Sequence, residues 1–187
     1  VNWDAIPAIA VSEIAVVGGN PVFGLNAIGG AISVTTKDGF EFQGATIDVM
    51  GGSFGRRQVA AEAGAQSGNF AAYVAGEYLE EEGFRDFSEA QIKRMYADLG
   101  FKGSAIELHL SLNAAKSIAG VVTAAPKDLL AIDWGRTFTS PQDTEYEVMM
   151  PSLRGSVKAT DTHTVSGLIY YRNFKQRVID GNLSEAD

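Results

Sequence analysis

The feature that most constrains the fold is an alternation of apolar and polar residues that recurs after residue 42. In the range 106–114 (IELHLSLNA), every even position is apolar or small and every odd position is polar. Successive side chains of a strand point to opposite faces of a sheet, whereas an amphipathic helix needs apolar residues three and four positions apart. The ranges 58–66 and 95–102 follow the same two-residue period. The pattern therefore predicts β-strands with one apolar and one polar face.

We expect seven strands in this part of the chain. The other four lie at 45–53, 70–80, 153–160 and 165–171, where the alternation is less regular. Short turns alternate with longer connections, the longest being a predicted 28-residue loop at 117–144. A soluble domain rarely holds so long a loop without secondary structure, whereas an outer-membrane barrel has tight turns at one end and long loops at the other. The rhythm favours antiparallel strands of an incomplete transmembrane β-barrel; a soluble β-sandwich remains an alternative.

The first forty residues have a different character. A helical turn is expected just before Ala10, followed by strands at 11–17 and 31–36, the second of which is rich in β-branched residues. This small α+β unit is too short to be a complete domain. We therefore predict a boundary that separates residues 1–39 from a mainly β region at 40–187.

Composition and failed motifs exclude several functions. The net charge of −8 argues against nucleic acid as a partner, and the absence of cysteine removes thiolate chemistry. The GLNAIG sequence at 24–29 lacks the Lys and Ser/Thr of a phosphate-binding loop, and GGSFG at 51–55 leads into a strand where a nucleophile elbow needs a helix. The two histidines, at 109 and 163, have no metal-ligand spacing. We predict no enzyme activity, no cofactor and no metal site.

The long loop is a candidate for ligand contact because it is rich in apolar and aromatic residues. Pro126 is placed to start a short helix there. Exposed aromatic and charged side chains on a loop often bind ligands, and Trp134, Arg136 and Phe138 are the candidates here. Packing of this loop on neighbouring loops is the alternative.

The range 11–37 carries a longer motif. An aromatic–glycine pair and a double glycine precede a β-branched strand that ends in lysine; the residues are Phe23, Gly24, Gly29, Gly30, Ile32, Val34 and Lys37. This arrangement resembles the end of the plug domain of TonB-dependent outer-membrane receptors. The family pattern also has an Arg and a Glu in the first strand and an Arg before the glycine, where this sequence has Glu13, Ala15 and Gly18. The charged contacts of that strand are therefore not carried over.

The resemblance implies a fragment: the C-terminal part of a plug (1–39) and the first strands of a barrel of the 22-stranded, plugged type. It implies energy-coupled uptake of a scarce nutrient, such as an iron–siderophore, haem or a cobalamin, through the outer membrane of a Gram-negative bacterium. TonB would act through a segment absent here. A passive porin-like barrel and a soluble β-sheet binding protein are the alternatives.

The same resemblance gives the two faces of the strands different surroundings. Leu108, Leu110 and Leu112 would face outer-membrane lipid. The residues expected to line the lumen or to contact the plug are Asp48, Glu62, Asp98, Glu107, His109 and Arg154.

Overall fold

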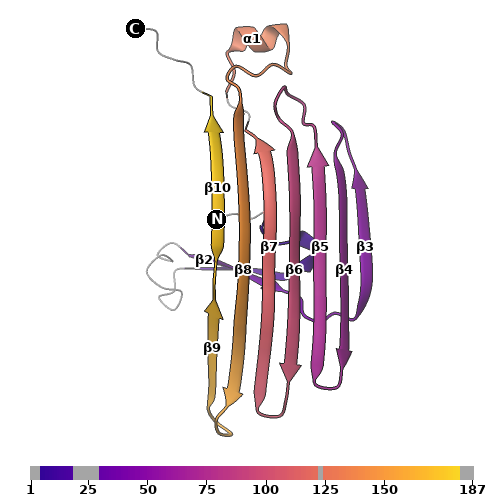
Figure 1. Cartoon of the computed structure of the whole chain (residues 1–187), viewed down its shortest axis with the longest axis vertical. Coiled ribbons are helices and arrows are strands. Elements are labelled where there is room, and N and C mark those ends of the chain that lie inside the picture. The colour runs from indigo at the N-terminus through magenta and orange to yellow at the C-terminus, as the bar shows by residue number, and fades with distance from the viewer. Residues whose placement is uncertain (1–4, 19–29, 122–123, 182–187) are drawn as a thin grey trace.

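The computed structural model describes residues 5–18, 30–121 and 124–181, and in these ranges the chain is mainly β. Figure 1 shows a single tall, open sheet in which every pairing is antiparallel. From β3 to β8, each strand pairs with the next one along the chain. The fold-class prediction is confirmed, because this open sheet matches part of a β-barrel. The strands are β3 (Gly44–Gly51), β4 (Arg57–Ser67), β5 (Phe70–Glu81), β6 (Ala90–Lys102), β7 (Ile106–Gly120), β8 (Gln142–Lys158), β9 (Thr164–Tyr170) and β10 (Asn173–Asp180).

Two of these strands, β9 and β10, pair with different parts of the same neighbour, β8, at the edge of the sheet. β9 pairs with the range 152–158 of β8, and β10 pairs with the range 142–149 of the same strand. The Tyr171 backbone N–H donates to the Pro151 carbonyl oxygen at 3.1 Å between the two strands. The sequence pattern predicted the strand at β9 but not the one at β10.

The predicted 28-residue loop is wrong in length. β7 continues to Gly120 and β8 begins at Gln142, so the connection covers residues 121–141. It contains the helix α1 (Lys127–Ile132), which follows Pro126 as the sequence indicated. Among the described residues, no helix is both long and apolar enough to cross a membrane.

The two faces of the sheet differ sharply in polarity. We call the face that carries Glu62, Tyr73, Tyr96 and His109 the polar face; these side chains are buried. We call the opposite face the apolar face, because it exposes large hydrophobic side chains from six strands: Ile47, Val74, Leu99, Leu110, Leu153 and Ile169.

A small N-terminal unit lies against the polar face, behind the sheet in Figure 1. It consists of the 3-10 turn η2 (Ala8–Ala10) and the antiparallel pair β1 (Val11–Val17) and β2 (Ala31–Thr36). These elements have the positions that the sequence predicted. Ala10 is fully buried in a cluster with Tyr73, Ala75 and Tyr96 of the sheet, so the apolar part of the interface is compact.

Glycine allows the chain to run close to the sheet as it leaves this unit. A Cβ atom at Gly64 would collide with the Phe42 carbonyl oxygen, and one at Gly100 would lie 2.6 Å from a ring carbon of Phe40. Both glycines are inside strands, where glycine has no propensity advantage. Their lack of a side chain makes room for the linking segment 37–43 between β2 and β3.

Candidate functional site: the interface between the N-terminal unit and the sheet

Three sets of polar contacts join the N-terminal unit to the polar face. The first is centred on Glu62 of β4, whose side chain is 4% exposed. Lys37 Nζ, just after β2, lies 3.0 and 2.9 Å from the two carboxylate oxygens of Glu62. The Tyr73 hydroxyl donates to the same carboxylate at 2.5 Å. A buried charge needs such partners because its desolvation is costly.

The second set is centred on Glu77 of β5, whose side chain is 1% exposed. Its carboxylate accepts hydrogen bonds from the Ala8 backbone N–H at 3.1 Å and from Gln58 Nε2 at 3.0 Å. An Arg94 guanidinium nitrogen lies 2.5 Å away and balances the charge. One buried carboxylate therefore holds the start of η2 against β4, β5 and β6.

The third set fixes the end of β2. Thr36 Oγ1 donates to the Tyr96 hydroxyl oxygen at 2.8 Å. The Lys37 backbone N–H donates to the Ala10 carbonyl oxygen at 2.8 Å, so η2 and the end of β2 are also tied to each other. The unit thus contacts the sheet as one piece rather than through separate strands.

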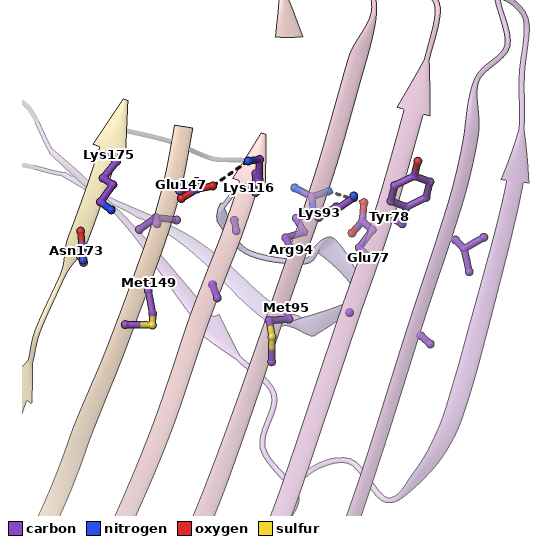
Figure 2. Close-up of a pocket in the computed structure, with 16 residues that line it drawn as sticks. Glu77, Tyr78, Lys93, Arg94, Met95, Lys116, Glu147, Met149, Asn173 and Lys175 are labelled. Atoms are coloured by element: carbon purple, nitrogen blue, oxygen red, sulfur yellow. Dashed lines mark hydrogen bonds and ion pairs between the residues drawn. The ribbon is translucent and has the colours of Figure 1, made fainter. Parts of the chain in front are cut away.

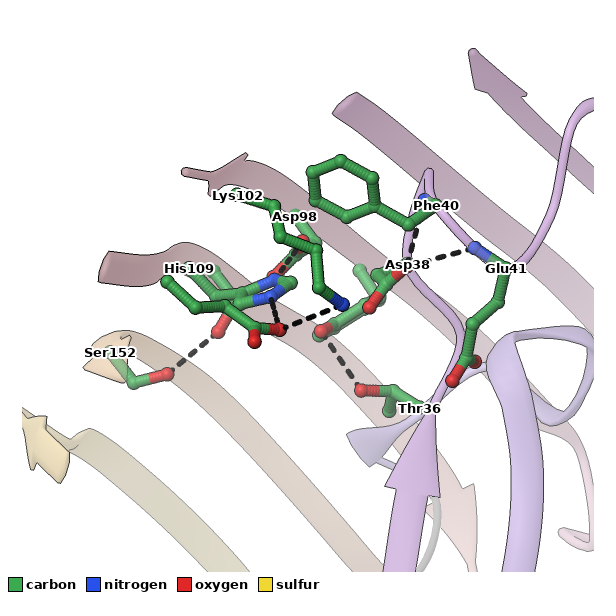
Figure 3. Close-up of polar contacts among 11 residues, drawn as sticks. Thr36, Asp38, Phe40, Glu41, Asp98, Lys102, His109 and Ser152 are labelled. Atoms are coloured by element: carbon green, nitrogen blue, oxygen red, sulfur yellow. Dashed lines mark hydrogen bonds and ion pairs between the residues drawn. The ribbon is translucent and has the colours of Figure 1, made fainter. Parts of the chain in front are cut away.

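A polar chain continues under the linking segment (Figure 3). His109 Nδ1 lies 2.9 Å from Asp98 Oδ1, and His109 Nε2 lies 3.3 Å from Glu107 Oε1. The side chains of Asp98 and His109 are each 3% exposed. The ring of Phe40 packs edge-on against the imidazole, with centroids 6.1 Å apart. Lys102 lies 3.4 Å from Glu107 at the outer end of this chain.

The six predicted lumen residues all lie on the polar face, but only four of them make the contacts described above. Glu62 belongs to the interface, and Asp98, Glu107 and His109 form the chain beneath Phe40. Asp48 is opposite Ala60 and Arg154 is opposite His109 in the register, and both residues are exposed.

The motif residues divide between described and undescribed parts of the chain. Phe23, Gly24 and Gly29 lie outside the described residues. Gly30 has a φ of 137°, and Ile32 and Val34 pair with β1. Lys37 contacts Glu62 of the sheet.

Sequence reasoning did not single out Tyr73, Glu77, Arg94 or Tyr96. A signal existed for Tyr96, because it shares the alternation parity of Asp98 in the same strand. Tyr73 is directly opposite Asp98 in the register, which places it on the same face. The mixed sequence of β5 gave no comparable indication.

The candidate ligand residues lie beyond α1, at the end of the sheet that carries the longer connections (Figure 1). Trp134 is 73% exposed and Phe138 is 46% exposed, while Arg136 Nε is 3.7 Å from Asp133 Oδ2. This connection is bound to the one before β6: the Asp86 N–H donates to the Gly135 carbonyl oxygen at 2.8 Å, and the Thr137 hydroxyl donates to the Asp86 carbonyl oxygen at 2.6 Å. The two connections therefore form one joined surface.

In the described part of the chain, no three His, Asp or Glu side chains are grouped so that they could hold a metal ion. The arrangement is instead a polar interface between two structural units. One ion pair, between Lys37 and Glu62, crosses this interface, together with hydrogen bonds from Ala8 to Glu77 and from Thr36 to Tyr96.

Comparisons with known proteins bear on the fold. No model of a protein family matches the sequence, and no curated protein matches it. Among solved structures, the siderophore receptor PiuA from Acinetobacter baumannii is similar, with a TM-score of 0.73 and 17% sequence identity. The match covers 90% of this chain and 27% of that receptor, so the chain spans about a quarter of the length of this structural neighbour. At this identity the likeness concerns the fold.

Proposed function

We propose that the chain is part of a TonB-dependent outer-membrane receptor that imports a scarce nutrient, with the N-terminal unit as the end of the plug and the sheet as the first part of the barrel wall. The ligand would be an iron–siderophore, haem, a cobalamin or a similar compound. The observation that carries the proposal is the contrast between the two faces. One face is polar and covered by the N-terminal unit, and the other exposes large apolar side chains.

The apolar face has the dimensions of a membrane-crossing surface. Between Phe70 and Tyr78 of β5 there are nine residues, counting both ends, and a transmembrane strand needs about 9–11 residues. The rings of Phe70 and Phe101 lie together near the short-turn end, with centroids 5.0 Å apart. Aromatic residues at this position suit the girdle of an outer-membrane barrel.

The polar interface suits a plug that is held and then released. The contacts to Glu62, Glu77 and Tyr96 hold the N-terminal unit while it fills the interior. A pull on the unit toward the short-turn side would have to separate them. No bond in the ligand is made or broken in this function, which is binding coupled to conformational change.

Two experiments test the proposal on the protein in its native host. Fractionation should recover it with the outer membrane; recovery in the soluble fraction would favour a soluble binding protein. Growth on a limiting nutrient should require both this protein and TonB. Uptake that persists without TonB would favour a passive porin-like barrel and would contradict the receptor proposal.

A further inference from the structure

The apolar face changes character abruptly toward the end that carries α1. One register row crosses five strands and contains Tyr78, Lys93, Lys116, Glu147 and Lys175. The next row toward the short turns contains Gly76, Met95, Ala114, Met149 and Asn173. Charged side chains therefore begin one row beyond an apolar and small-residue row.

A groove lies on this face where the two rows meet. Its volume is about 790 Å³, within the range of about 300–1,000 Å³ that is common for small-molecule sites. Gly76 and Ala114 line its floor with minimal side chains, and Met95 and Met149 border it (Figure 2). The methionine side chains are flexible and fit irregular apolar ligands.

The charged edge of the groove is positive. Lys116 is neutralised by Glu145 and Glu147, each 2.8 Å from its Nζ. Lys93 and Lys175 have no carboxylate within ion-pair distance among the described residues, and Lys175 lies opposite Glu147 in the register, so this edge carries three lysines against two carboxylates. Lys93 Nζ instead lies 5.6 Å from the centroid of the Tyr78 ring.

We propose that this groove binds a lipid with a phosphorylated headgroup, with an acyl chain along Met95 and Met149 and the phosphate at the row of lysines that includes Lys93 and Lys175. Charge complementarity selects this occupant. An apolar channel next to an edge with more lysines than carboxylates suits an amphiphile whose anionic part lies at the membrane edge. The inference rests on the proposed membrane location of the apolar face, but it does not depend on which nutrient is imported.

The test is native mass spectrometry of the whole protein in a neutral detergent, titrated with phosphatidylglycerol. We expect the double variant Lys93→Gln/Lys175→Gln to bind this lipid about thirtyfold more weakly, which is the fold-change for about 1 kcal/mol lost per lysine near a membrane surface. Ala114→Phe, which fills the groove and keeps both lysines, should weaken binding as well. The matched control is Lys127→Gln/Lys158→Gln, which removes the same charge from exposed positions away from the groove and should bind like the unmodified protein.

Further probes identify what the groove recognises. Diacylglycerol with the same acyl chains should bind much more weakly, and glycerol phosphate alone should not compete. Four outcomes would each overturn the proposal. They are equal binding of diacylglycerol, full competition by glycerol phosphate, a second protein copy in place of lipid, and equal losses in the control variant. If the protein is recovered from cells in soluble form, the membrane assignment fails. Lipid binding that is insensitive to the two lysines, in a protein that does reside in the membrane, overturns this inference alone.

Discussion

Lys37 and Glu62 form a 2.9 Å ion pair between the end of β2 and the polar face of β4. The carboxylate is almost completely buried, while the lysine side chain is 25% exposed. The Tyr73 hydroxyl and the Phe42 ring, 5.0 Å from Lys37 Nζ, complete the surroundings of the pair. The N-terminal unit is thus attached to the sheet by a charge on each side, at the point where the linking segment begins.

Replacing Glu62 with Gln should loosen this attachment. Hydrogen bonds to a charged group contribute about 1.5–3 kcal/mol, and we expect a loss of stability in that range together with faster proteolysis in the linking segment. Urea unfolding in detergent micelles and limited proteolysis measure the two effects. Glu89→Gln is the matched control, because Glu89 is exposed and has no ion pair among the described residues. Equal behaviour of the two variants would show that the pair does not hold the unit.

Gly64→Ala should displace the linking segment by steric overlap. The new methyl group would collide with the backbone at Phe42, which cannot rotate away as a side chain does. Overpacking of this kind costs about 1–3 kcal/mol. Gly167→Ala in β9 is the control, since nothing lies within 4 Å of the position that its methyl group would take. The free energy of unfolding of the two variants should differ; an equal change would place Phe42 away from Gly64 in solution.

Leu110→Arg tests the membrane assignment of the apolar face. Leu110 is 53% exposed between Leu99 and Leu153, and an arginine at mid-membrane costs about 2–4 kcal/mol in a transmembrane barrel. Ile118→Arg, on the same face of the same strand but beyond Lys116, should cost about 0–1 kcal/mol as an interfacial position. Unfolding in lipid vesicles measures both. Equal, small costs would contradict burial of Leu110 in lipid.

Thr137→Val should separate the two long connections locally. The variant loses the hydrogen bond to the Asp86 carbonyl oxygen, which contributes about 1 kcal/mol. We expect faster hydrogen exchange of the Asp86 amide, whose acceptor is the Gly135 carbonyl oxygen. Thr164→Val, at the exposed start of β9, should leave this exchange rate unchanged. An unchanged rate in Thr137→Val would mean that the backbone contact alone holds the connections together.

Trp134→Ala and Phe138→Ala should reduce nutrient uptake if these exposed rings contact the ligand. Ile132→Ala is the control, because Ile132 belongs to the same connection and is 83% exposed. Growth under nutrient limitation measures the effect, with the amount of protein in the membrane measured in parallel. A similar loss in all three variants would indicate a general disturbance of the connection rather than ligand contact.

The sequence predicted strands well where apolar residues lie on the exposed face and polar residues on the covered face. The range 106–114 has apolar residues on the exposed face and polar residues on the covered face, and β7 begins where expected. In the first half of β8 the sense is reversed: Tyr146 and Val148 are buried, whereas Glu145 and Glu147 point to the opposite face. As a result, the predicted loop ran to Thr144 and the predicted strand began only at Leu153. β10 has the same reversed pattern: Lys175 and Arg177 lie on the face of Glu145 and Glu147, and Phe174 and Val178 lie on the opposite face.

The specific pairings at the interface were beyond sequence reasoning for a different reason. Glu62 was expected to line the lumen or contact the plug, and Lys37 was part of the motif, but no local pattern pairs two residues 25 positions apart. Their meeting depends on how the N-terminal unit lies on the sheet. That placement is set by the buried cluster around Ala10 and by the space that Gly64 and Gly100 leave open.

Lys93, Lys116 and Lys175 lie in one register row, and this alignment limits the changes in strand length that the sheet can accept. The switch from apolar to charged residues falls on one register row, although the residues of that row lie at separate places along the chain. An insertion of two residues inside β6 would keep every side chain on its proper face, yet it would displace the charge of that strand by about 7 Å relative to its neighbours. Among related sequences, differences in length should therefore occur in the connections at 82–89 and 121–141. The number of residues between the short turns and the charged row should stay the same, even where the residues themselves differ.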